Sequence, residues 1–169
     1  MRKGVLILFL PLLMACHGDP PMVTPPETPD GSMKEHVINA HRTIAQSEET
    51  AIDQYIERRK WPAIKLDDGV RIYEYSKTTD KRVEYEDSVH IAYSVEAING
   101  KAIYDNIEET YVAGRRQTLL GLDNAVLHLH YGSGAKVIVP SSLAYGIGGD
   151  GDRIPQSAIL VIDVKVDKQ

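Results

Sequence analysis

The chain has 169 residues, a formal net charge of −5 and a single cysteine, Cys16. This length suits one ordinary domain with short accessory segments. A hydrophobic content of 43% and a charged content of 25% are typical of a globular chain, which excludes a largely disordered or a multi-span membrane protein. The acidic excess argues against a nucleic-acid partner. One cysteine excludes an internal disulfide and a cysteine-rich zinc site.

The N-terminus combines the features of a signal peptide with a candidate lipidation site. Two basic residues precede the apolar run VLILFLPLLMA, which is shorter than the roughly 20 residues of a membrane-spanning helix and fits a secretory signal peptide. Its end, Leu13-Met14-Ala15-Cys16, resembles the bacterial lipobox, in which cleavage before the cysteine is followed by lipidation of the thiol. We therefore expect residues 1–15 to be a lipoprotein signal peptide and Cys16 to carry the lipid. An ordinary cleaved signal peptide is the alternative.

The segment 16–31 that follows is rich in proline. Five of the nine prolines of the chain fall here: Pro20, Pro21, Pro25, Pro26 and Pro29. Such a stretch cannot pack a core and tends toward extended polyproline II structure. It predicts a tether between a membrane and a folded domain. Together with the lipid anchor, it predicts a location in the bacterial cell envelope, with the domain facing the periplasm or the cell exterior.

Residues 32–61 have the pattern of a helical arm. Ser32 and Glu35 form a capping-box match, and no glycine or proline interrupts residues 33–60. Apolar residues recur at helical spacing, although Ser47 could instead begin a second helix. The arm either packs on its own domain or forms a homodimer, and the sequence leaves both interpretations open.

Residues 68–169 alternate strand-like segments with one short helical segment. The strand-like segments lie at 70–77, 89–98, 102–105, 136–139 and 158–166. Asn99-Gly100 is a typical hairpin turn. Residues 119–131 have apolar residues at helical spacing, and Gly132 beyond them is a natural left-handed cap. This order predicts an α+β domain with a mostly antiparallel sheet wrapped over one short helix.

Three motifs in this domain resemble phosphate- or metal-binding or nucleophilic sites, but each lacks residues that such a site needs. The glycine-rich segment 146–152 lacks the Lys and Ser/Thr of a phosphate loop and the ligand spacing of a calcium loop. His128 and His130 are two residues apart on a predicted helix, so they face different directions. Ser141 has no nucleophile-elbow context. We therefore expect no cofactor, no metal site and no covalent catalysis.

The C-terminal segment carries a specific family pattern. Residues 132–166 read GSGAKVIVPSSLAYGIGGDGDRIPQSAILVIDVKV, and the L-A-Y-G, I-P, A-x-L and D-V elements recur at the spacing of the FKBP-type peptidyl-prolyl cis-trans isomerases. Residues 87–105 resemble the hairpin of the same family. The resemblance covers about residues 68–168 and implies a five-stranded antiparallel sheet curled around a short helix. The lipid-anchored form with a helical arm is similar to the gliding-motility-associated isomerases of some bacteria.

The resemblance also implies a proline pocket between the helix and the sheet. It assigns catalytic roles to Tyr93, Asp105 and Tyr145. It assigns substrate binding to Tyr104, Thr118, Leu119, Leu122, Ala144, Ile154 and Ile162. The Tyr145 hydroxyl and the Leu119 N–H would hold substrate carbonyls, and Asp105 would organise the site by a hydrogen bond to Tyr93.

Three positions depart from the family pattern. Leu122 stands in place of a tryptophan, Ile162 in place of an aromatic residue, and a rim phenylalanine is replaced near Glu109. The expected pocket is therefore less aromatic than usual. The resemblance implies a tethered isomerase acting on proline-containing clients among exported proteins. The departures favour the alternative, a chaperone or an envelope or motility-assembly binding module with little or no turnover.

Overall fold

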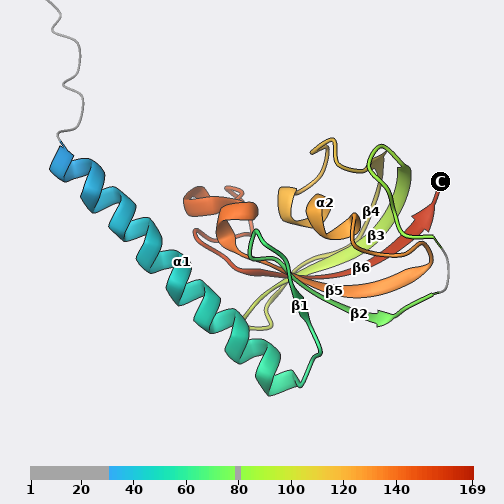
Figure 1. Cartoon of the computed structure of the whole chain (residues 1–169), viewed down its shortest axis with the longest axis horizontal. Helices are drawn as coiled ribbons and strands as arrows, with labels where there is room; N and C mark the ends of the chain where they lie inside the picture. Colours follow the sequence, from blue (N-terminus) through green and yellow to red (C-terminus); the bar gives the residue numbers. More distant parts are fainter. Residues whose placement is uncertain (1–30, 79–80) are drawn as a thin grey trace, which may run out of the picture.

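The computed structural model describes residues 31–78 and 81–169 (Figure 1). The predicted signal peptide, Cys16 and nearly all of the tether lie outside the described residues. Within the described part, the helices and strands in chain order are α1 Gly31–Arg59, β1 Ile64–Lys65, β2 Arg71–Ser76, β3 Ser88–Ala97, β4 Ala102–Val112, α2 Leu120–Val126, β5 Ser133–Val139 and β6 Leu160–Lys168. Two 3₁₀ turns, η1 Ser141–Leu143 and η2 Gly146–Gly148, connect β5 to β6.

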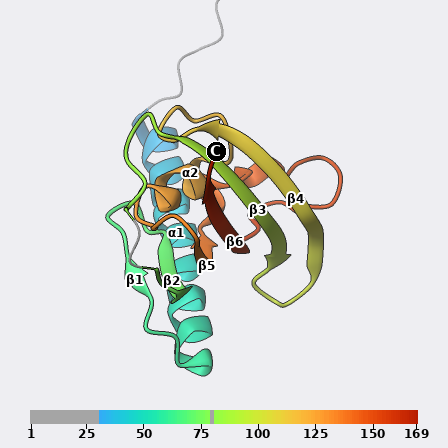
Figure 2. The same cartoon turned by 90° about the vertical axis from the view of Figure 1, so that its right-hand side faces the viewer.

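The strands form one antiparallel sheet in the order β1-β2-β5-β6-β3-β4. The sheet curves around α2, most visibly along β3 and β4 (Figure 2). The predicted fold class is confirmed, including the N-terminal helix. The sixth strand, β1, is a two-residue edge strand that the sequence pattern did not indicate.

The hairpin of β3 and β4 turns at Asn99-Gly100, as predicted, where Gly100 has a φ of +86° that favours glycine. The predicted return strand at 102–105 is too short, because β4 continues to Val112. β4 is an edge strand, and most of its side chains are exposed or half-buried. It therefore lacks the apolar alternation that marks a strand in a sequence.

The prediction of a helix over 119–131 is wrong in length, because α2 ends at Val126. Beyond it, His128 and Leu129 donate their N–H groups to carbonyls three residues back. An α-helix would use carbonyls four residues back, so this segment is a tight turn and not a continuation of α2. Leu129 is nevertheless fully buried. Leu129 keeps the helical spacing from Val126 because it packs in the same core, not because it lies in the helix. Gly132 precedes β5 and does not cap α2.

Helix α1 is continuous, so the alternative second start at Ser47 is not used. The hydroxyls of Ser47 and Thr50 donate to the carbonyls of Ile44 and Gln46 within the same helix. This back-bonding satisfies the hydroxyls inside a helix. Neither α1 nor any other helix in 31–78 and 81–169 is long and apolar enough to cross a membrane.

Strands β5 and β6 are covered on both faces. Alternate residues such as Val137 and Ile162 belong to the main core beneath α2. Their neighbours Ile138 and Val161 pack against Ile52 of α1 on the opposite face. Because side chains alternate across a strand, the two central strands serve two separate apolar clusters.

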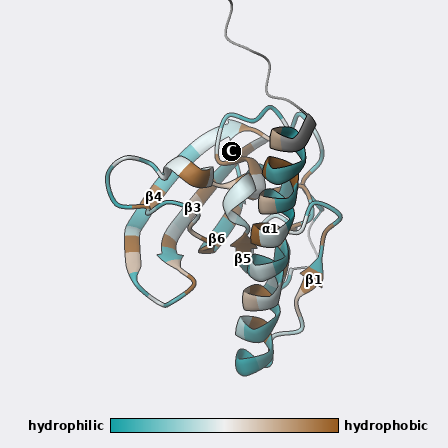
Figure 3. Cartoon of the chain, turned by 90° about the vertical axis from the view of Figure 1, so that its left-hand side faces the viewer, coloured by the Kyte–Doolittle hydropathy of each residue, from teal (hydrophilic) through white to brown (hydrophobic). Residues whose placement is uncertain are grey.

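Polar contacts also hold α1 against the domain. The buried carboxylate of Glu48 accepts hydrogen bonds from the Ser141 N–H at 3.0 Å and the Ser141 hydroxyl at 2.5 Å. The buried guanidinium of Arg71 donates to Asp53 at 2.9 Å. The N-terminal half of α1 extends past these contacts and carries apolar positions among polar ones (Figure 3). Its apolar residues Val37 and Ile44 are exposed.

Candidate functional site

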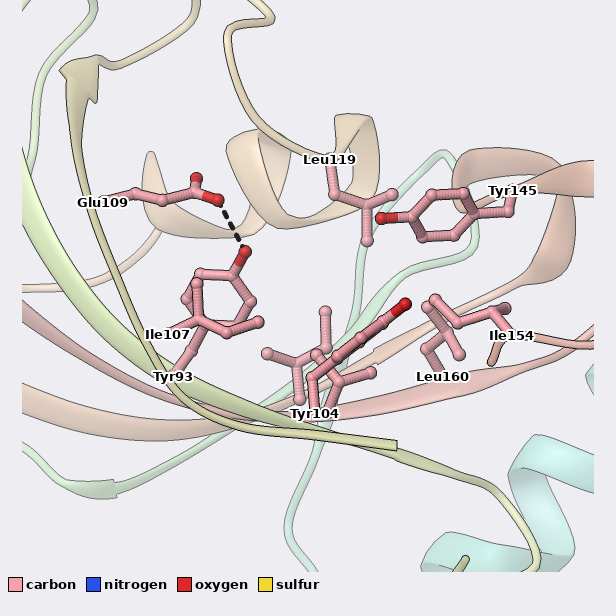
Figure 4. A pocket seen from close by; sticks show the side chains of 10 residues that line it. Tyr93, Tyr104, Ile107, Glu109, Leu119, Tyr145, Ile154 and Leu160 are labelled. Atoms are coloured by element: carbon pink, nitrogen blue, oxygen red, sulfur yellow. Dashed lines mark hydrogen bonds between the residues drawn. The ribbon is translucent and has the colours of Figure 1, made fainter. Parts of the chain in front are cut away.

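A cavity of about 250 Å³ lies on the α2 side of the sheet (Figure 4). Its walls come from β3, β4, the residue before α2, the segments on either side of η2 and the start of β6. The lining residues are Tyr93, Val95, Tyr104, Ile107, Glu109, Leu119, Tyr145, Ile154, Leu160 and Ile162. Leu160 and Ile162 are fully buried and make an aliphatic floor, whereas Tyr145 is exposed and marks the mouth.

A bulge in β4 decides which side chains enter this cavity. Tyr93 pairs with Ile107, but Val95 pairs with Tyr104, so β4 has one residue more than β3 over this stretch. Such an extra residue bends a strand and changes which face its side chains point to. Tyr104 and Ile107 both line the cavity, while Asp105 between them is exposed outside it.

The bulge corrects one expectation from the family pattern. Asp105 does not bond to Tyr93; its carboxylate accepts a hydrogen bond from the Ser94 hydroxyl at 2.6 Å on the outer surface. The Tyr93 hydroxyl instead donates to Oε1 of Glu109 at 2.7 Å. The carboxylate that holds Tyr93 therefore comes from four residues further along β4.

Two of the three tyrosines in the cavity are tied to carboxylates. Burial and the bond to Glu109 raise the pKa of Tyr93 well above its usual range. The hydrogen bond to Asp150 raises the pKa of Tyr104 to about 12 and lowers that of Asp150 to about 2. Burial also raises the pKa of Tyr145, with contributions from the charges of Asp150 and Glu109. All three phenols are therefore protonated donors near neutral pH.

The hydroxyl of Tyr145 differs from the other two because it forms no hydrogen bond within the described part of the chain. It points into the cavity near Leu119 (Figure 4). The Leu119 N–H also has no partner among residues 31–78 and 81–169, since it precedes the first turn of α2. The mouth thus presents two donors that have no partner in the described residues.

The segment leading into α2 is held by Asp123, a residue that the sequence did not single out. This carboxylate is buried and accepts hydrogen bonds from the N–H groups of Gly114 and Arg116, both at 2.8 Å. Charge-assisted bonds to backbone N–H groups are stronger than neutral ones. Asp123 thereby fixes the loop that carries Leu119 to the cavity.

The segment between η2 and β6 is fixed by Asp150. Its Oδ1 accepts hydrogen bonds from the N–H groups of Asp152 at 2.9 Å and Ile154 at 2.8 Å, while its other oxygen accepts from Tyr104. These bonds place the buried side chain of Ile154 in the cavity wall. The glycine-rich segment is therefore a structured wall of the pocket.

The cavity brings together most, but not all, of the expected residues. Those that line it are Tyr93, Tyr104, Leu119, Tyr145, Ile154 and Ile162. Leu122 is fully buried in the core beneath and does not line the cavity, because a leucine side chain is much smaller than the indole expected there. Ala144 packs on the core, and Thr118 lies beside Tyr93.

Sequence reasoning missed three apolar lining residues, Val95, Ile107 and Leu160, and noted Glu109 only as a replacement. Val95 and Leu160 lie two residues from Tyr93 and Ile162, and strand alternation could have found both. Ile107 depends on the bulge, for which the sequence gives no clear signal. Across 31–78 and 81–169, no cluster of His, Cys, Asp or Glu could hold a metal ion.

An apolar cavity with tyrosine and backbone donors at its mouth, beside one short helix in a curled sheet, suits an apolar ring flanked by hydrogen-bond acceptors. The model of the FKBP-type peptidyl-prolyl cis-trans isomerase family matches residues 79–167, which is more than half of the chain. The chain therefore belongs to this family and is an FKBP-type peptidyl-prolyl cis-trans isomerase.

Individual proteins agree with this assignment. FK506-binding protein 2 of Dictyostelium discoideum is 32% identical over 109 residues, covering 62% of this chain and 80% of that protein. The isomerase FKBP11 of Bos taurus is 32% identical over 85 residues, covering 48% of this chain and 42% of that protein.

Solved structures show the same fold. A peptidyl-prolyl cis-trans isomerase of Pseudomonas syringae pv. tomato has a TM-score of 0.62 at 20% identity, covering 75% of this chain and 92% of that one. FkpA of Escherichia coli has a TM-score of 0.61 at 18% identity, covering 83% of this chain and 73% of that one.

Proposed function

We propose that this isomerase rotates Xaa-Pro bonds in exported proteins while a lipid on Cys16 tethers it to a membrane of the bacterial envelope. The observation that carries the catalytic part is the cavity itself. It has an aliphatic floor of Leu160 and Ile162 and an unused donor, the Tyr145 hydroxyl, at its mouth.

The physics of the reaction requires no more than such a cavity. Amide resonance sets a barrier of about 18–20 kcal/mol to rotation about the Xaa-Pro bond. The twisted amide has lost this resonance and is less polar than the planar one. An apolar enclosure therefore binds the transition state better than the ground state, which is how binding accelerates a reaction. The Tyr145 hydroxyl and the Leu119 N–H would hold the carbonyls on either side.

A protease-free isomerisation assay on Xaa-Pro peptides tests this proposal. Replacing Tyr145 with Phe removes one hydrogen bond, so kcat/KM should fall roughly 2- to 10-fold, the equivalent of about 0.5–1.5 kcal/mol. Tyr85→Phe, which changes an exposed tyrosine outside the cavity, is the matched control. Equal rates for the wild type and Tyr145→Phe would remove Tyr145 from the mechanism.

The second candidate is a chaperone or an envelope or motility-assembly module that binds clients with little turnover. It is favoured by Ile162 in the cavity floor and by Leu122 in the core beneath, because both stand where the family pattern has aromatic residues. A protein that suppresses the aggregation of an unfolded client but does not speed isomerisation would support this candidate. Loss of both properties in Ile162→Ala would show that the same cavity serves them.

The proposed anchor is supported by the sequence before residue 31, where a charged start and an apolar run end at Cys16. One acyl chain gives only marginal membrane binding, whereas two or three chains suffice for stable attachment. We expect Cys16→Ser to leave the membrane fraction and to lose its lipid by mass spectrometry. Unaltered membrane attachment of Cys16→Ser would contradict the anchor.

We also propose that α1 can contact a second copy of the chain. Val37 and Ile44 lie on the same helix face as Tyr55, since they are separated by near-multiples of 3.6 residues. The sheet covers Tyr55, whereas Val37 and Ile44 remain exposed. Light scattering on the chain without its first 16 residues should show a dimer, and Val37→Asp with Ile44→Asp should make it monomeric. A monomer at all concentrations would leave α1 as a spacer only.

A further inference from the structure

Glu109 is the one charged side chain that lines the cavity among the described residues. It lies on β4 across the cavity from Tyr145 (Figure 4). Its Oε1 accepts the hydrogen bond from Tyr93 at 2.7 Å. A carboxylate has about four acceptor sites, so this bond leaves most of its capacity unused.

No cation of the described chain compensates this charge. The ion pairs within 31–78 and 81–169 do not include Glu109. A half-buried carboxylate without a counter-charge is costly, and a cation supplied from outside lowers that cost. The negative charge of Glu109 therefore favours the binding of a cationic group at the mouth of the cavity.

A second negative charge lies on the other side of the mouth. Asp150 is bonded to the Tyr104 hydroxyl, and the charges of Asp150 and Glu109 add to the effect of burial in raising the pKa of Tyr145. Arg153 is nearby, but it lies over the Tyr104 ring at 5.3 Å and pairs with Asp152. The field at the mouth is thus negative on both sides.

We propose that Glu109 makes this isomerase selective for client segments with a lysine or arginine next to the proline. This inference rests on the proposed isomerase function and names its substrate class. With the proline ring on the aliphatic floor, a neighbouring basic side chain reaches the rim and pairs with the free oxygen of Glu109. Such pairs at a partly exposed rim are worth about 1 kcal/mol, which corresponds to a preference of roughly fivefold.

The test compares peptides that differ only beside the proline, with lysine, norleucine or glutamate placed before it in one series and after it in another. Norleucine matches the apolar stem of lysine without its charge. In the wild type, we expect kcat/KM to rank lysine above norleucine above glutamate in one of the two series, with a lysine preference of roughly fivefold that shrinks as salt screens the charges.

Two variants locate the effect. Glu109→Gln keeps an oxygen that can accept the Tyr93 bond but removes the charge, so the ratio of lysine to norleucine should fall to about one. Glu108→Gln makes the same charge change one residue away, on an exposed side chain that does not line this cavity, and should keep the wild-type ratio.

The outcomes separate this inference from the proposed function. If the wild type isomerises all peptides equally, or if Glu109→Gln retains the preference, the inference is wrong while the isomerase function stands. A preference lost equally in Glu108→Gln would reflect overall charge and would also overturn it. If no peptide is isomerised, the proposed function fails, and calorimetric binding of the lysine and norleucine peptides to the wild type decides the selectivity alone.

Discussion

The two faces of strands β5 and β6 do different work in this molecule. On one face, α2 and the curled sheet enclose a large apolar core with the cavity at its edge. On the other, the C-terminal half of α1 covers a small cluster around Ile52 and Tyr55. The first face builds the site and the second attaches an arm, although both use neighbouring residues of the same strands.

This difference separates what holds the domain together from what holds the arm in place. A residue on the α2 face contributes to the global stability of the domain, whereas one on the α1 face contributes to the docking of a single helix. Regions of a protein can open separately when few buried contacts join them. The comparison therefore predicts different unfolding behaviour for substitutions on the two faces.

Leu122→Ala should have the largest effect, because Leu122 is fully buried between α2 and the sheet. Truncation of such a leucine costs about 2–5 kcal/mol through lost burial and a residual cavity. We expect a loss near 4 kcal/mol in the free energy of unfolding, in one transition, by chemical denaturation. Ile147→Ala, on a highly exposed side chain, is the control and should change little. A loss below about 1 kcal/mol would show that the surrounding core side chains relax and fill the space left by the leucine.

Tyr55→Ala should cost about 3 kcal/mol, and the cost should fall on the docking of α1. Tyr55 contacts the ring of Trp61, the only tryptophan of the chain, with centroids 5.6 Å apart. Trp61 fluorescence should therefore report α1 leaving before circular dichroism reports loss of the sheet. Gln54→Ala, an exposed change on the same helix, is the control. A single coincident transition in Tyr55→Ala would show that the two faces unfold as one unit.

The α2 face was the more predictable of the two. Tyr145 and Ile154, which the L-A-Y-G and I-P elements singled out, both line the cavity, because loop residues at a fixed spacing keep their positions when the fold is kept. The apolar pattern also located both helices. It could not give the length of α2, because Leu129 has the same spacing whether it lies in a helix or in a turn packed on the core.

The errors at the site arose where tertiary pairing overrides local pattern. The bulge in β4 adds one residue opposite Tyr93 and Val95, and this extra residue turns Asp105 outward. No local feature of the sequence specifies that register. The contact of Glu48 with Ser141 was equally hidden, because it joins residues 93 positions apart.

Glu48→Ala should have an intermediate effect. It tests whether a change on α1 alters the η1 turn next to the cavity. Glu48 is 8% exposed and binds both the N–H and the hydroxyl of Ser141, at the start of the η1 turn that precedes Tyr145. Hydrogen bonds to a charged group contribute about 1.5–3 kcal/mol, so we expect a loss near 2 kcal/mol. Hydrogen exchange at Ser141 should quicken in this variant and stay unchanged in Glu57→Ala, an exposed control on the same helix. Unchanged exchange in Glu48→Ala would mean that η1 holds its shape without α1.

Asp105→Ala should have the smallest effect and sharpens the assignment of the site to the inner face of the hairpin. The Asp105 carboxylate lies outside the cavity and accepts its hydrogen bond from Ser94, so its removal leaves the lining residues in place. We expect kcat/KM on Xaa-Pro peptides to stay within about twofold of the wild type and stability to change by less than about 1 kcal/mol. Glu109→Gln, measured in the same assay, gives the comparison from the inner face. A tenfold fall in Asp105→Ala would instead mean that β4 shifts its register when a client binds, because only the loss of the bulge would turn Asp105 toward Tyr93.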